Sequence, residues 1–296
     1  MYPGGGTPPT DALPHPLDAL VGTWTGVGFN AIWRPHFPAS PQDRFLELNA
    51  TTESLVFTEI NGPIPNRGLL QKDINMFGVT YDQQISGADG SGLHNEPGIW
   101  AVVPQTTDPL EGPTIVRMAS IPHGTTILAQ GTVVDVDGPP IIVDNDIIPF
   151  GLNGGPPPKG TFAQAEGTFT ELNLATDTAF RQKDPSITQA MVENPNSVLQ
   201  DVIAGQTIKH TTALIIATND SPVPGGGTSN TAFLQGGAAN AAQANALASL
   251  VSAIFWIETI SEPGQPDRLQ LQYTQTVMLD FNGLRWPHVT VATLSK

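Results

Sequence analysis

Histidine is the residue type that gives this chain metal-ligand and acid–base chemistry near neutral pH, because the sequence has six histidines and no cysteine. The absence of cysteine excludes disulfides, thiolate metal ligands and cysteine nucleophiles. We discount His15 and His36, which lie in a proline-rich arm and in a loop. The remaining candidates fall in or beside predicted strands, and they are His94, His123, His210 and His288.

The last predicted strand, residues 284–294, places one of these imidazoles among mostly apolar neighbours. Because side chains alternate along a strand, one face carries Trp286, His288, Thr290, Ala292 and Leu294. A neutral imidazole in such surroundings can serve as the axial ligand of a haem iron or of another metal. The alternative is a buried histidine that hydrogen-bonds a backbone carbonyl.

Alternation also places His210 with an apolar set that includes Leu214 and Ile216, so we expect His210 to face inward. The spacing of the histidines gives no support for a zinc or non-haem iron centre, because neither His-x-His nor His-Glu-x-x-His occurs. No Gly-x-Ser-x-Gly motif suggests a serine nucleophile either.

The elements that must position these histidines are mostly strands. Alternating, β-branched segments predict strands over 22–33, 45–59, 74–85, 92–103, 114–121, 125–136, 207–218, 250–260, 269–279 and 284–294, with a further strand-like run over 161–174. This profile predicts an all-β fold, an antiparallel up-and-down barrel of about ten strands. The best helical pattern, over 186–204, contains Pro195, which we expect to split it into two short helices, with Asn196 capping the second.

We expect residues 1–16 to form a flexible N-terminal arm and residues 17–296 to form a single barrel domain, with insertions near 135–160, 184–205 and 219–250. The formal net charge is -15, with 12 basic residues against 27 acidic ones, which argues against a nucleic-acid partner. No run of about 18 apolar residues and no signal-peptide pattern is present, so we expect no membrane span and a cytoplasmic protein.

Three patches of the sequence, in order, resemble the nitrobindin family, the haem-binding relatives of the calycin barrels that include fatty-acid-binding proteins and lipocalins. Gly22-Thr23-Trp24-Thr25-Gly26-Val27-Gly28 resembles the Gly-x-Trp-x-Gly-x-Gly opening of that family. Leu93-His94-Asn95-Glu96-Pro97-Gly98-Ile99-Trp100 is similar to its His-x-Glu-x-Gly-aromatic strand. His288-Val289-Thr290-Val291-Ala292-Thr293-Leu294 is similar to its closing strand. The chain is longer than a nitrobindin domain, and the extra residues fall in the expected insertions.

The resemblance implies a barrel that holds haem b (heme) in an apolar cavity, with His288 as the axial ligand and His94 on the distal side. His123 lies near the position of a further histidine-containing bend, and His210 and Trp24 complete the candidate cofactor-binding residues. The family's activity would then be NO or O₂ binding, or peroxynitrite detoxification.

Two other functions fit the same fold. One is a metal-free carrier of a hydrophobic small molecule such as a fatty acid, with Trp24 among the residues that line the cavity or fill the core. The other is an enzyme that acts on a hydrophobic substrate, with His94, Glu96, His210 or His288 as acid–base groups.

Overall fold

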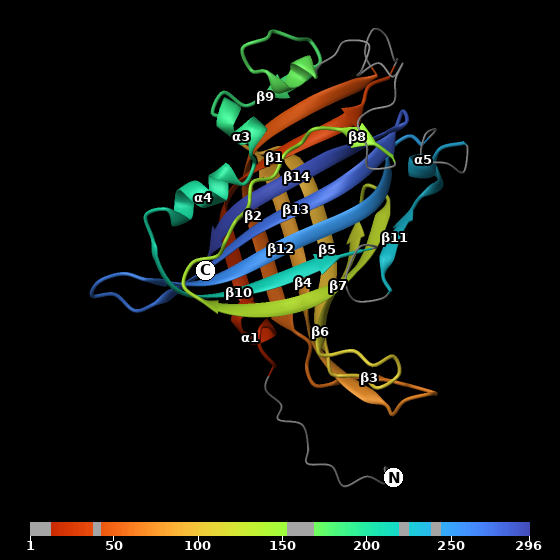
Figure 1. Cartoon of the computed structure of the whole chain (residues 1–296), viewed down its shortest axis with the longest axis vertical. Coiled ribbons are helices and arrows are strands. Elements are labelled where there is room, and N and C mark those ends of the chain that lie inside the picture. Colours follow the sequence, from red (N-terminus) through yellow and green to blue (C-terminus); the bar gives the residue numbers. More distant parts are fainter. Residues whose placement is uncertain (1–12, 38–42, 153–168, 219–224, 238–243) are drawn as a thin grey trace.

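Ten long strands form a closed antiparallel barrel in the computed structural model (Figure 1). The structure describes residues 13–37, 43–152, 169–218, 225–237 and 244–296. In chain order, the barrel strands are β1 (Gly22–Pro35), β2 (Arg44–Glu59), β4 (Ile74–Gly87), β5 (Gly92–Val103), β6 (Thr114–Ile121), β7 (Thr125–Asp137), β10 (Thr207–Ala217), β12 (Leu247–Ser261), β13 (Arg268–Phe281) and β14 (Leu284–Ser295). Each strand pairs with the next barrel strand, and β14 pairs with β1 to close the ring. The prediction of an all-β, ten-stranded up-and-down barrel is confirmed.

Four short strands extend the barrel wall: β3 (Ile64–Asn66), β8 (Phe150–Gly151), β9 (Arg181–Lys183) and β11 (Gly227–Asn230). The strand predicted over 161–174 is wrong in its described part, because Thr170–Leu172 forms the 3-10 helix η1. Residues 161–168 lie outside the described residues. The turn brings the Glu171 carboxylate to Arg44 at 3.0 Å, in an ion pair with no solvent exposure on either side chain.

The predicted broken helix is present as α3 (Gln189–Glu193) and α4 (Ser197–Ile203), with Asn196 at the N-cap position of α4. The Asn196 side chain is used elsewhere, however, because it donates to the carbonyl of Val143 at 2.7 Å and accepts from the Thr274 hydroxyl at 2.6 Å. It therefore fastens α4 to the barrel wall. Figure 1 shows both helices outside the barrel.

Two apolar clusters lie on opposite sides of the barrel wall. The inner cluster fills the barrel from the end where β1 begins, and the short helix α1 (Leu17–Leu20) adds two fully buried leucines there. The outer cluster lies between the wall and the β7–β10 connection, where the rings of Trp33 and Trp286 are 5.4 Å apart. α1 therefore closes one end of the barrel.

The predicted arm is described only from residue 13 onwards, and the single-domain organisation stays a prediction. The insertion expected near 135–160 starts the long β7–β10 connection. Within the described ranges, no helix has the length and apolar character needed to cross a bilayer.

Candidate functional site

Three of the four candidate histidines meet at one end of the barrel. In an up-and-down barrel the β4–β5, β6–β7 and β13–β14 turns lie at the same end, and His94, His123 and His288 lie in or near these turns. The rings of His94 and His123 are 5.7 Å apart. His288 is close enough to both for a positive charge on either ring to lower its pKa. The topology thus gathers side chains from two strands and one turn that are distant in the sequence.

This histidine end is the more exposed end of the barrel. The His94 side chain is 16% exposed, His288 is partly exposed and His123 is exposed. At the opposite end, Trp24 and the α1 leucines are completely buried. A ligand that enters the barrel would therefore meet the histidines first.

His288 is held as a neutral imidazole. The amide nitrogen of Asn30 donates to its Nε2 at 3.0 Å and also to the hydroxyl oxygen of Thr290 at 2.7 Å. Burial, and then repulsion by charge on His94 and His123, lowers the pKa of His288 to about 3. The ring therefore carries no charge at neutral pH.

A buried polar network lies next to the histidines, toward the closed end. His94 Nε2 lies 3.3 Å from a carboxylate oxygen of Glu96, whose other oxygen accepts from Arg117 and from the Tyr81 hydroxyl. Arg117 also donates to Tyr81 at 2.8 Å and to Gln275 at 2.6 Å. Within the part of the chain that the structure describes, the polar partners of the Arg117 guanidinium are side chains inside the barrel. Glu96 is therefore a fixed anion that holds the His94 ring in place.

Glu53 forms a second buried polar group. It accepts from the Tyr273 hydroxyl at 2.6 Å and from the Gln83 amide at 3.3 Å. Burial raises the pKa of Glu53 to about 7, against the smaller lowering effect of these hydrogen bonds. Unlike Glu96, Glu53 has no cation beside it among the described residues to compensate its burial.

The structure places the other two sequence candidates away from this cluster. Trp24 lies at the closed end, where its indole nitrogen donates to the Leu20 carbonyl at 2.7 Å. His210 lies near the start of β10 at the same closed end, with a side chain that is 41% exposed and Nε2 3.3 Å from Asp135. No register shift separates His210 from Leu214 and Ile216 of the inner cluster, so His210 lies on the expected face of β10, but at the closed end of the barrel its side chain is exposed.

Asn30 and Arg117 are site residues that the sequence reasoning missed. The available signal was alternation, because Asn30 shares the inward face of its strand with Trp24, and an inward polar residue needs a partner. Its partner His288 is 258 positions away. That separation is what hides the pair from local sequence reasoning.

The described side chains suit a metal that takes one ligand from the protein better than a metal that takes several. Among the described residues, no group of three or more histidine, aspartate or glutamate side chains is placed to hold a metal ion. A single neutral imidazole is the ligand that haem iron uses in many proteins. The Asn30 carbonyl oxygen is buried without a hydrogen-bond partner, whereas the Asn30 amide nitrogen faces His288.

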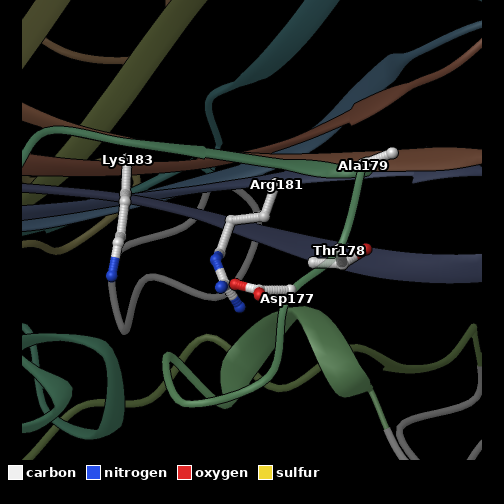
Figure 2. Close-up of a pocket in the computed structure, with 5 residues that line it drawn as sticks. All are labelled: Asp177, Thr178, Ala179, Arg181 and Lys183. Carbon is white, nitrogen blue, oxygen red and sulfur yellow. The ribbon is translucent and has the colours of Figure 1, made fainter.

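Hollows also lie outside the barrel, and two of them bear on function. Figure 2 shows one of about 520 Å³, lined by Asp177, Thr178, Ala179, Arg181 and Lys183. Its Arg181 guanidinium is committed to structure, because it donates to the carbonyls of Glu171, Asn173 and Thr176 at 2.7–2.9 Å. The other, of about 880 Å³, has a mainly apolar lining that includes Phe169, Leu172 and Val192.

Comparison of the chain with protein-family models, with curated proteins and with solved structures gave no match.

Proposed function

We propose that the histidine end of this barrel binds haem, with His288 as the axial ligand. The observation that carries the proposal is the meeting of His94 on β5, His123 in the β6–β7 turn and His288 on β14 at one end of a calycin-like barrel. The resemblance of the β1, β5 and β14 sequences to nitrobindin strands supports the same choice of ligand.

The state of His288 suits this role. An axial imidazole must be neutral to offer a lone pair, and the pKa of about 3 keeps His288 neutral under ordinary conditions. No carboxylate lies within hydrogen-bond distance of its ring among the described residues, where its hydrogen-bond partner is the neutral Asn30 amide. His288 would therefore act as a neutral ligand.

His94 and His123 would supply polar groups beside the bound ligand. Glu96 accepts a hydrogen bond from His94 Nε2, which fixes the ring and leaves its other nitrogen for a ligand. Haem, when bound, supplies an iron that can take NO or O₂, or react with peroxynitrite in the ferric state. The residues of the chain would bind, orient and partly desolvate that centre.

The proposal is tested by adding hemin to the purified protein and recording its absorption spectrum. We expect a Soret band that titrates to one haem per chain. His288→Ala should remove the band or shift it to that of unligated haem. A spectrum identical to free hemin, with the wild-type protein folded, would refute the proposal.

A second candidate function is the binding of a metal-free hydrophobic molecule in the 880 Å³ hollow outside the barrel. Its volume lies in the range of small-molecule sites, and Phe169, Leu172, Leu174 and Val192 line it. Native mass spectrometry of the purified protein would reveal a co-purified lipid or metabolite. Leu172→Glu should then lower its occupancy, whereas His288→Ala should not.

A further inference from the structure

The Asn30 carboxamide makes two hydrogen bonds through one end only. Its nitrogen donates one N–H to His288 Nε2 at 3.0 Å and the other to Thr290 Oγ1 at 2.7 Å. A ring nitrogen that accepts a hydrogen bond cannot carry a proton, so the proton of the neutral His288 ring must be on Nδ1. In this arrangement Asn30 determines the tautomer of His288.

The Nδ1 side of His288 is the side available to a ligand. Nδ1 has no hydrogen-bond partner among the described residues, and it is not one of their buried unpaired atoms. With its proton in place, Nδ1 can donate to a carbonyl or carboxylate, but it has no lone pair for a metal.

The other end of the Asn30 carboxamide is unused. Asn30 is 4% exposed, and its carbonyl oxygen is buried without a hydrogen-bond partner, which is uncommon for a polar atom. Rotating the carboxamide by half a turn would exchange this oxygen with the nitrogen. The oxygen could then accept from the Thr290 hydroxyl and from a proton on His288 Nε2, which would leave the lone pair on Nδ1.

We propose that Asn30 is a positioning residue that switches His288 between two forms, one that donates a hydrogen bond to a ligand and one that binds a metal. With the amide nitrogen toward His288, the site presents an N–H to an acceptor group. With the carbonyl oxygen toward His288, the site presents a lone pair to iron. Metal-bound histidines usually donate their second N–H to a carbonyl or carboxylate, and the Asn30 oxygen is placed for that task.

The tautomer part of the proposal is tested on the ligand-free protein by NMR of ¹⁵N-histidine-labelled samples. We expect His288 of the wild type to carry its proton on Nδ1 and none on Nε2. Asn30→Asp can only accept, so it should place a proton on Nε2. Asn30→Ala removes both constraints and should give a mixture of tautomers.

Asn49→Ala is the matched control, because Asn49 lies opposite Asn30 on β2 and its amide nitrogen is unpaired. It should leave the wild-type pattern unchanged. A wild-type ring already protonated at Nε2, or an Asn30→Ala ring that keeps the wild-type pattern, would overturn the inference.

The metal part rests on the proposed function and is tested on the ferrous haem complex by resonance Raman spectroscopy. A stronger acceptor behind His288 strengthens the iron–histidine bond, so Asn30→Asp should raise its stretching frequency and Asn30→Ala should lower it. Equal frequencies in all three proteins would overturn the switch. Failure to form any haem complex would instead refute the proposed function, and the NMR result would still decide the role of Asn30.

Discussion

Glu96 and Arg117 form an ion pair inside the barrel in which the side chains are 0% and 1% exposed. Burial by itself would raise the pKa of Glu96, but Arg117, followed by His94 and Tyr81, holds it at about 2. The carboxylate beside His94 is thus charged at any pH at which the protein is used. A carboxylate with so low a pKa is a poor general acid or base near neutral pH, which disfavours Glu96 among the acid–base candidates.

Removing one member of this ion pair should lower the free energy of unfolding. Arg117→Met leaves the Glu96 charge buried without its cation, so we expect a loss of about 3–5 kcal/mol in the free energy of unfolding. The double variant Glu96→Gln/Arg117→Met should be more stable than Arg117→Met alone, because no lone charge remains. Urea unfolding of all four members of the cycle measures this, and additive single effects would contradict the pairing.

Glu53 should make stability depend on pH. Its pKa is 4.5 in the unfolded chain and about 7 in the folded one, so the folded state binds the proton more tightly. The stabilisation of the folded state by this proton is complete below pH 4.5 and is lost as the pH rises through about 7. It amounts to about 3 kcal/mol.

The measurement is the free energy of unfolding at pH 5 and at pH 8. Glu53→Gln should remove most of the decrease that the wild type shows between these values. Glu59→Gln, at an exposed position of the same strand, should keep it. If Glu53→Gln retains the full wild-type decrease, the carboxyl does not titrate in this range.

Gly28 should tolerate no side chain. A Cβ at this position would lie 2.2 Å from the carbonyl oxygen of Val291, on the strand that carries His288. Gly28→Ala must therefore push β1 and β14 apart, at a cost of about 3 kcal/mol. Gly92→Ala is the control, since a Cβ there meets nothing within 4 Å. Equal melting temperatures of the two variants would show that the wall is not packed as described.

Asn196 should control the attachment of α4. Its replacement by alanine leaves the Thr274 hydroxyl and the Val143 carbonyl without their partner, at about 1–3 kcal/mol for each buried group. Hydrogen exchange of the α4 amides should accelerate in Asn196→Ala. Asn95→Ala, which removes an exposed hydrogen bond to Asp82, should leave α4 unchanged. Unaltered exchange in Asn196→Ala would mean that other contacts hold the helix.

The strands were predictable because their signals are local. β5 and β6 begin and end where alternation and flanking turn residues place them, and Pro195 splits the helical segment as expected. The strand prediction over residues 161–174 was wrong in its described part, because apolar and polar residues alternate there as they do in a strand. The described part of this segment forms the turn η1 instead, and Glu171 in this turn makes a buried ion pair with Arg44. Because Arg44 and Glu171 are 127 positions apart, their ion pair leaves no recognisable pattern in the neighbouring sequence.

The site was predictable only in part, for a related reason. Alternation gives the face of a strand but not the height along the barrel, so the sequence assigns His288 and His94 to one site only through the resemblance. His210 is not part of the histidine cluster, because it lies at the opposite end of the barrel, beside Asp135 and solvent. The role of Asn30 needs the closed ring, which brings β1 against β14.

The most direct measurement of the central claim is a hemin titration of His288→Ala beside His210→Ala, followed by the Soret absorbance. His210 is the matched histidine, on a barrel strand but at the far end. We expect His210→Ala to bind haem as the wild type does, and His288→Ala to lose most of the histidine-ligated spectrum. Equal titrations of the two variants, or a loss confined to His210→Ala, would contradict it.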